Sequence, residues 1–112
     1  MHVHFVGIGG IGVSALARFY RASGDKVTGS DMHASPLISE LRREGIKVSI
    51  DHVASNVLPS ADLVLYSAAV PRTNPELVKA RNLGIATKSY AEAVGDLTRR
   101  YAMFAVIGAH GK

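Results

Sequence analysis

A glycine-rich segment near the N-terminus constrains the fold more than any other feature of the sequence. Gly7-Ile8-Gly9-Gly10-Ile11-Gly12 matches the pattern G-x-G-x-x-G between an expected strand, residues 2–6, and an expected helix, residues 11–23. Here the glycines permit a tight turn, close approach of backbone to a phosphate, and close packing of helix on strand. Free amides at the helix start, with the helix dipole, therefore predict a diphosphate site. The alternative is that the glycines serve only the turn.

An acidic residue follows at a spacing that supports this prediction. Asp31 ends the expected strand 26–30 and lies nineteen residues beyond Gly12. A carboxylate about 20 residues after the glycines accepts hydrogen bonds from ribose hydroxyls. The alternative is a solvated loop acid before Ser35. Together, the two features predict a nucleotide with a diphosphate, without saying which nucleotide.

The remaining chain alternates β-branched runs with stretches of helical spacing. This pattern predicts an α/β fold, a Rossmann-like doubly wound sheet of about five parallel strands with helices on both faces. Further strands are expected at residues 46–50, 63–66, 85–87 and 102–107. Helix starts are expected at Ser35-Pro36, at Asn74-Pro75 and at the capping box of Ser89 and Glu92, the last helix running to about Thr98; helix ends are expected at Gly24, Gly45 and Gly84.

Composition narrows the classes of partner. The chain has 112 residues and a formal net charge of +4, with basic residues scattered along it, which favours an anionic small molecule over nucleic acid. It contains no cysteine, which excludes disulfides, thiolate zinc sites and cysteine nucleophiles. No apolar run approaches the roughly 18 residues of a membrane span, so we expect a cytoplasmic protein without a membrane partner.

The histidines divide into two groups. His2 and His4 share one face of a strand but lack a third metal ligand at a suitable spacing, so we interpret them as packed or edge histidines and expect no metal site. His33 and His52 follow strands at the edge where ligands bind. There each either contacts a base or ribose or is simply exposed.

The last residues predict a second domain. The apolar strand expected at residues 102–107 leads into Gly108-Ala109-His110-Gly111-Lys112, the front half of a phosphate-binding loop. Without the helix that should follow, we expect no phosphate-binding geometry there. An unpaired apolar strand pairs readily with another chain, so a dimer through this segment is expected as one outcome.

Several motifs in fixed order carry a resemblance that covers essentially the whole chain. The segments are Phe5 to Gly12, Ser14 to Ala17, Gly29-Ser30-Asp31, Tyr66 to Val70, Asn74-Pro75-Glu76 and Gly108 to Lys112. This combination resembles the N-terminal part of the Mur ligase family. It implies a UDP-sugar-binding domain over residues 1–99. Residues 100–112 would be a linker, the first strand and a truncated phosphate loop of an ATP-binding domain.

The resemblance also implies roles for individual residues. The substrate UDP-N-acetylmuramate would be held by Gly9, Gly10, Ile11 and Gly12 at the diphosphate, Asp31 at the ribose, His52 by the uridine, and Ser67 with Ala68 near the diphosphate or sugar. In the full-length enzyme the ATP phosphates would meet Gly108, His110, Gly111 and Lys112. No catalytic residue, resident cofactor or metal ligand is expected within these 112 residues.

The implied activity belongs to peptidoglycan precursor synthesis. ATP, with Mg²⁺, phosphorylates the lactyl carboxylate of UDP-N-acetylmuramate, and L-alanine attacks the acyl phosphate to form an amide. This chain alone should be inactive. It departs from the family at Ala109, usually Thr, which removes a hydroxyl beside the ATP site, and at Val13, usually Met. The alternatives are a related murein-peptide recycling ligase and an NAD-binding regulatory or dehydrogenase domain.

Overall fold

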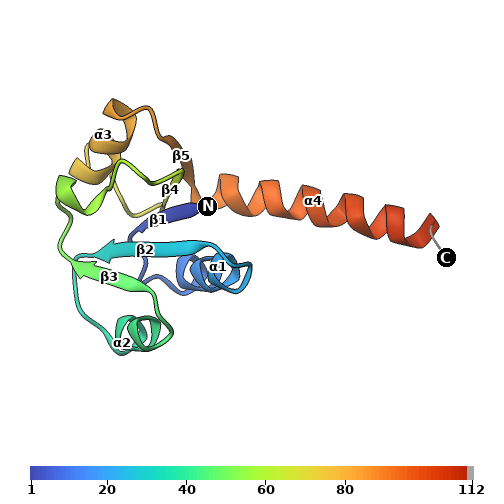
Figure 1. Ribbon diagram of the computed structural model, residues 1–112, viewed down its shortest axis with the longest axis horizontal. Helices are drawn as coiled ribbons and strands as arrows, with labels where there is room; N and C mark the ends of the chain where they lie inside the picture. Colours follow the sequence, from blue (N-terminus) through green and yellow to red (C-terminus); the bar gives the residue numbers. More distant parts are fainter. Residues whose placement is uncertain (111–112) are drawn as a thin grey trace.

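The computed structural model describes the backbone of residues 1–110 and the side chains of residues 1–102. Five parallel strands form one sheet in the order β3-β2-β1-β4-β5 (Figure 1). The strands are β1 (His2–Val6), β2 (Lys26–Asp31), β3 (Lys47–Ile50), β4 (Leu63–Tyr66) and β5 (Ala86–Ser89). The helices are α1 (Ile11–Ala22), α2 (Pro36–Arg43), α3 (Pro75–Asn82) and α4 (Tyr90–His110), with a 3-10 turn η1 (Ala54–Asn56). The expected doubly wound α/β fold is confirmed.

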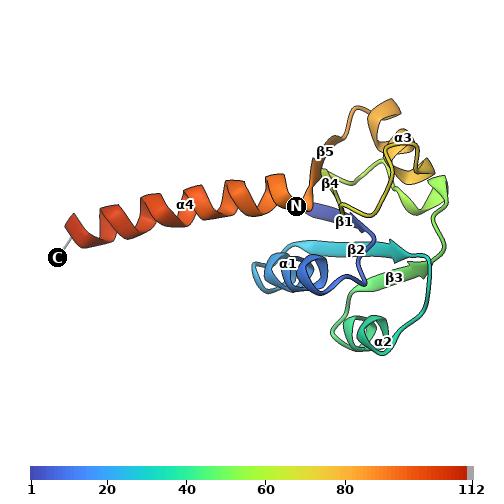
Figure 2. The same cartoon turned by 180° about the vertical axis from the view of Figure 1, so that it is seen from behind.

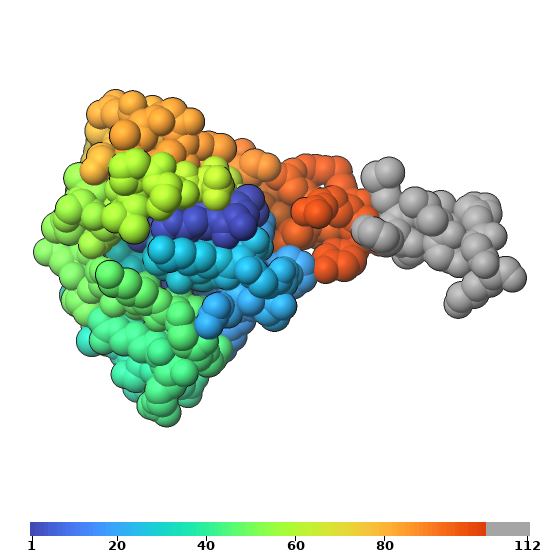
Figure 3. Space-filling view, viewed as in Figure 1, coloured from blue at the N-terminus to red at the C-terminus, as the bar shows by residue number. Residues whose placement is uncertain are grey.

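The central strand β1 divides its side chains between two cores, because successive residues of a strand point to opposite faces. Val3 and Phe5 join the larger core with residues of α1, α2 and α4. Val6 joins the smaller core with Leu77 and Ala80 of α3. Figures 1 and 2 show α3 set apart from the α1 and α2 pair, with β1 near the middle of the body in Figure 3. Helices therefore cover both faces, as predicted.

The helix boundaries follow the capping residues named from the sequence. Ser35 Oγ accepts a hydrogen bond from the Ile38 amide at 3.2 Å, and Asn74 Oδ1 accepts one from the Glu76 amide at 2.9 Å. Ser89 and Glu92 bond reciprocally, both at 3.1 Å. The expected helix ends are also confirmed, since three glycines leave helices with positive φ: Gly24 at 92°, Gly45 at 92° and Gly84 at 72°.

The strand expected at residues 102–107 is wrong, because α4 continues through this segment to His110. A lone strand would leave its backbone groups unpaired, whereas a helix satisfies them within the segment. Ala, Met, Phe and Ile are all compatible with a helix once α4 has begun. The expected dimer through residues 102–107 therefore lacks the strand on which it was based.

Without the helix that should follow it, the end of the chain was expected to lack phosphate-binding geometry. The backbone of Gly108 and His110 is helical, so the turn of a phosphate-binding loop is not formed there. Gly111 and Lys112 lie outside the described residues. The role of these four residues in a full-length enzyme stays a prediction.

Candidate functional site

The glycine loop joins the carboxyl end of β1 to the start of α1. Gly7 has φ of +82°, the left-handed conformation that favours glycine, and Ser30 O accepts bonds from the Gly7 and Ile8 amides at 2.9 and 3.0 Å. Gly10 is the N-cap of α1 and provides no side-chain cap. The amides of Ile11 and Gly12 have no acceptor within the helix because they lie in its first turn. They are therefore available to an anion.

Two glycines of the loop make room for side chains of other elements. A Cβ on Gly9 would lie 2.7 Å from Asp31 Oδ2, and a Cβ on Gly12 would lie 2.7 Å from Tyr90 Oη. The sequence predicted that Gly12 allows the helix to approach the strand; the structure shows that it accommodates the first residue of α4. The spacing of the glycines thus ties the loop to both β2 and α4.

Asp31 lies beside the glycine loop, at the end of β2. Its Oδ2 accepts a hydrogen bond from the Gly9 amide at 2.8 Å, and Oδ1 lies 3.4 Å from the His33 amide. The structure therefore brings the predicted ribose ligand and the predicted diphosphate loop together, although they are 22 residues apart. His33 is exposed and is not part of the cleft described next.

A cleft of about 570 Å³ opens at this edge of the sheet. Its size is within the range of small-molecule sites, about 300–1,000 Å³. It is lined by Asp31 and Met32 at the end of β2, by Asp51 and His52 after β3, and by residues from the loop after β4 to the start of α3: Ala69, Val70, Pro71, Thr73, Asn74 and Pro75. The carboxyl ends of parallel strands are where ligands bind in doubly wound folds.

The predicted residues after β4 lie beside the cleft rather than in its lining. Ser67 donates its amide to Val6 O at 3.0 Å, and its Oγ accepts a bond from the Ala69 amide at 3.2 Å. A Cβ added to Gly7 would lie 3.0 Å from the Cβ of Ser67, so Ser67 packs against the glycine loop. Ala68 is exposed. Ser67 therefore adjoins the glycine loop, and the ligand-binding roles of Ser67 and Ala68 stay predictions.

A buried carboxylate beneath the cleft was missed from the sequence. Glu76 of α3 has no exposed surface. Its oxygens accept hydrogen bonds from His4 Nε2 at 2.6 Å, Ser30 Oγ at 2.9 Å and Asn56 Nδ2 at 3.1 Å, and Oε2 lies 3.3 Å from His52 Nδ1. From the sequence, Glu76 was only part of the helix start after Asn74. A possible signal was the pair of histidines on one face of a buried strand, which requires polar partners.

The network continues from His4 to the far end of β1. His4 Nδ1 lies 2.8 Å from Thr28 Oγ1, which lies 2.9 Å from His2 Nε2. His2 Nδ1 is buried and has no partner among the described residues. His2 and His4 are therefore packed polar side chains of the sheet, as predicted from the sequence. Within the described residues, no group of three or more metal-binding side chains is gathered.

Burial and hydrogen bonding shift two pKa values in this network. Burial opposes ionisation of Glu76, but the bonds from His4, Asn56 and Ser30 outweigh it and hold the pKa of Glu76 below its usual value. Burial, together with nearby Lys26 and His4, lowers the pKa of His2. The folded protein therefore favours a charged Glu76 and a neutral His2.

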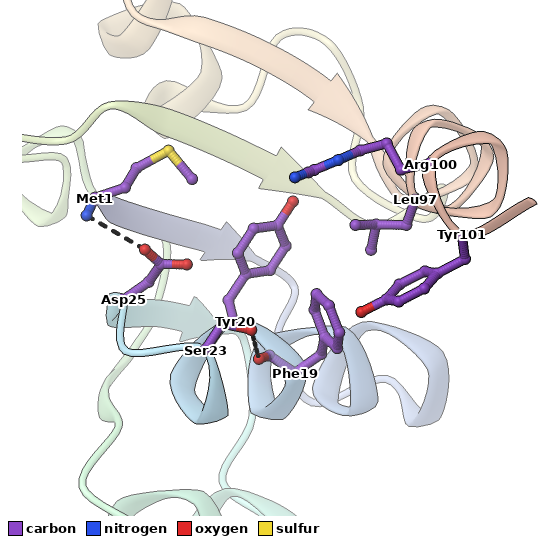
Figure 4. A pocket seen from close by; sticks show the side chains of 8 residues that line it. All are labelled: Met1, Phe19, Tyr20, Ser23, Asp25, Leu97, Arg100 and Tyr101. Atoms are coloured by element: carbon purple, nitrogen blue, oxygen red, sulfur yellow. Dashed lines mark hydrogen bonds and ion pairs between the residues drawn. The ribbon is translucent and has the colours of Figure 1, made fainter. Parts of the chain in front are cut away.

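A second cavity, of about 280 Å³, lies at the opposite edge of the sheet (Figure 4). The terminal amine of Met1 pairs there with Asp25 at 3.3 Å. Phe19 of α1 meets Tyr101 of α4 edge-on, with ring centroids 6.1 Å apart. This cavity is at the amino ends of the strands, remote from the glycine loop, and we assign it no ligand. Among the described residues, no helix is both long and apolar enough to cross a membrane.

The sheet order, the glycine loop and Asp31 define a doubly wound α/β domain with a candidate nucleotide site. Residues 2–102 match the Mur ligase family, catalytic domain. The chain belongs to the Mur ligase family, and the resemblance drawn from its motifs is confirmed.

Curated relatives agree over almost the whole chain. UDP-N-acetylmuramate–L-alanine ligase of Campylobacter jejuni subsp. jejuni serotype O:2 is 51% identical over 111 residues, covering 99% of this chain and 26% of that protein. The ligase of the same name from Acetivibrio thermocellus is 46% identical, covering 99% and 24%. The chain therefore spans about a quarter of the length of these relatives.

Solved structures show the same domain. The crystal structure of UDP-N-acetylmuramate-alanine ligase MurC from Thermotoga maritima matches with a TM-score of 0.85 and 37% identity, covering 89% of this chain and 23% of that one. A murein peptide ligase from Psychrobacter arcticus matches with a TM-score of 0.74 and 30% identity, covering 80% and 19%.

Proposed function

We propose that this chain is the UDP-sugar-binding N-terminal part of a UDP-N-acetylmuramate–L-alanine ligase. The observation that carries the proposal is the glycine loop bonded to Asp31 at the carboxyl edge of the sheet, in a chain 51% identical to a ligase of that name. Its part of the work is to bind and orient the nucleotide sugar for a reaction completed by the rest of the enzyme. A cytoplasmic location stays a prediction.

The ligand would extend along the carboxyl edge of the sheet. The amides of Gly9, Gly10, Ile11 and Gly12 and the positive end of α1 would hold the diphosphate. Asp31 would accept bonds from the ribose hydroxyls. The base would enter the cleft by His52, and Ser67 with Ala68 would adjoin the diphosphate or sugar. In this arrangement the Gly9 amide is shared with Asp31, which fixes the carboxylate before ligand binds.

The whole enzyme would form an amide in two steps. A lactyl carboxylate oxygen attacks the γ-phosphorus of ATP and ADP leaves; the amine of L-alanine then attacks the acyl carbon, and phosphate leaves. The resemblance also implies Mg²⁺, but the described residues gather no set of metal ligands, so we derive no step through it. Because residues 108–112 would supply only the front of the ATP loop, and the groups that bind L-alanine would lie elsewhere in the enzyme, residues 1–112 alone should have no ligase activity.

The test is calorimetric titration of the chain with UDP-N-acetylmuramate. In Asp31→Asn, one oxygen can still accept from the Gly9 amide, but the charge that serves the ribose is lost. A hydrogen bond to a charged group contributes about 1.5–3 kcal/mol, so affinity should fall about 10- to 100-fold. Asp96→Asn, which alters a carboxylate paired with Lys88, should bind like the unaltered chain. Unchanged affinity in Asp31→Asn would remove this residue from the site.

The same titration separates the proposed function from one of its two alternatives. An NAD-binding regulatory or dehydrogenase domain would bind NAD and not the UDP-sugar. A murein-peptide recycling ligase would share the UDP-sugar site, so only a chain extended by its following domains can distinguish it, by its use of peptide in place of L-alanine. The higher identity and TM-score of the T. maritima alanine ligase favour the proposal over this second ligase.

A further inference from the structure

The buried carboxylate beneath the cleft has no place in the proposed ligand contacts. Glu76 does not line the cleft, yet its oxygens hold four side chains from four parts of the chain: His4, Ser30, Asn56 and His52. Burying a charge is costly unless it is well bonded, so a carboxylate at this depth requires an explanation. Of the four side chains, only His52 also lines the cleft.

The hydrogen bonds determine which nitrogen of His52 carries the proton. Ser30 Oγ donates its hydrogen to Glu76 Oε1 at 2.9 Å. Its oxygen is then free to accept, and it lies 2.9 Å from His52 Nδ1. The second neighbour of Nδ1 is Glu76 Oε2, at 3.3 Å, which can only accept. With two acceptors facing it, Nδ1 carries the hydrogen, and a neutral ring then has a bare lone pair at Nε2.

The position of His52 places this lone pair where a base would lie. Asp31 and Ile50 are partners in the register of β2 and β3, so the ribose carboxylate and the histidine two residues after Ile50 share one edge. His52 Nε2 has no partner within the described part of the chain, while 10% of the side chain is exposed. A planar base in the cleft could therefore meet Nε2 with its edge.

We propose that Glu76 is a positioning residue that, with Ser30, holds His52 with Nε2 as an acceptor and so makes the cleft prefer uracil to cytosine. The inference rests on the proposed function, in which the base lies by His52. Uracil joined to ribose has one N–H donor, at N3, which a bare Nε2 accepts. Cytosine carries a lone pair at N3, which faces the lone pair of Nε2 and is repelled.

The first test observes the tautomer directly. Nitrogen NMR of the unliganded chain at about pH 8, where an ordinary histidine is neutral, should show His52 with a protonated Nδ1 and a bare Nε2. The signals are assigned by their absence in His52→Gln. The opposite tautomer would overturn the inference, whatever the chain binds.

The second test compares the affinities of UDP and CDP, which have nearly the same shape. In Glu76→Gln, an amide nitrogen at the Oε2 position would donate to His52 Nδ1. An amide nitrogen at the Oε1 position could not accept the hydrogen of Ser30 Oγ. That hydrogen would then be donated to His52 Nδ1. Either way Nδ1 becomes the acceptor and the proton moves to Nε2. The preference for UDP should fall from about tenfold to about twofold or less.

Controls separate a specific effect from general damage. Glu40→Gln changes an exposed carboxylate that pairs with Arg18, so the tenfold preference should remain. Ser30→Ala removes one of the two acceptors at Nδ1 and should reduce the preference partly, which provides a milder variant if Glu76→Gln does not fold. Weaker binding of both nucleotides at an unchanged ratio would overturn the inference and leave the proposed function standing. Failure of the unaltered chain to bind UDP would instead contradict the proposed function.

Discussion

Gly29, in the middle of β2, has no side chain because the glycine loop occupies its place. A Cβ there would lie 2.6 Å from Ile8 Cδ1 and 3.0 Å from the backbone oxygen of Phe5. Because backbone cannot easily move away, we expect Gly29→Ala to lower the free energy of unfolding by about 1–3 kcal/mol. Urea unfolding followed by circular dichroism measures the change.

Gly95 provides the matched control for this substitution. It lies within α4, and the nearest atom to an added Cβ is Arg99 Nη1 at 3.6 Å, an ordinary contact. Alanine is the better helix former, so Gly95→Ala should raise the free energy of unfolding by about 0.5–1 kcal/mol. Equal effects of the two substitutions would show that the contact between Ile8 and Gly29 does not constrain the fold.

The positions of some site residues could be predicted from the sequence, and those of others could not. The places of Gly7, Gly9 and Asp31 were predictable because a known pattern fixes them relative to the first two strands. Glu76 was not, since its partners lie on β1, β2 and η1, and nothing in the local sequence after Asn74 shows that the carboxylate turns inward. Long-range hydrogen bonds of this kind have no local pattern.

Helix α4 packs on the body of the domain through few contacts, and one of them is at Tyr101. Its ring meets Phe19 edge-on but is 56% exposed. A chain ending at Arg100 should therefore unfold with about 0.5–1 kcal/mol less free energy than one ending at Tyr101. Thermal melts of the two chains test this difference, and both should bind UDP equally because the contact is at the opposite edge from the cleft. A large difference would mean that Tyr101 contributes to the core as the earlier residues of α4 do.

The same helix shows where prediction of elements fails. The five strands of the sheet and the starts of the four helices were predicted within a few residues, because each has caps, glycines or a clear period. Residues 102–107 are apolar without a clear period, and such a run fits a buried strand or a helix equally well. The decision depends on whether neighbouring strands are available, and β5 does not pair with this segment in the sheet.

At the scale of the whole molecule, the buried network makes stability depend on pH. The folded pKa of His2 is lowered, so its contribution is present above about pH 6.5 and is lost as pH falls through the folded pKa. The folded pKa of Glu76 is also lowered, so its contribution is present above about pH 4.5 and is lost below that. Urea unfolding should therefore show stability falling in two stages on acidification.

Two variants identify which residue causes each stage of the decline in stability. His2→Gln should flatten the decline that begins near pH 6.5, and Glu76→Gln should reduce the one below pH 4.5, to which Glu44, Glu92 and Asp96 also contribute because their pKa values are lowered. Arg18 and Glu44 form an ion pair on the surface. Removing this ion pair by Glu44→Gln should leave the decline that begins near pH 6.5 unchanged. A decline with the same two stages in both network variants would show that other groups cause it.

The Ile8 side chain, lodged against Gly29, has a consequence for the energetics of recognition. A loop that wraps a phosphate commonly loses conformational entropy when the ligand arrives, and this loss is subtracted from the affinity. Here the middle of the glycine loop is already anchored: Ile8 is fully buried, its amide is bonded to Ser30 O, and the next amide is bonded to Asp31. Much of that entropy is lost when the chain folds, and the stability of the sheet compensates for it. Under the proposed function, the loop amides would already be in place, and little of the free energy of diphosphate binding would go into ordering the backbone.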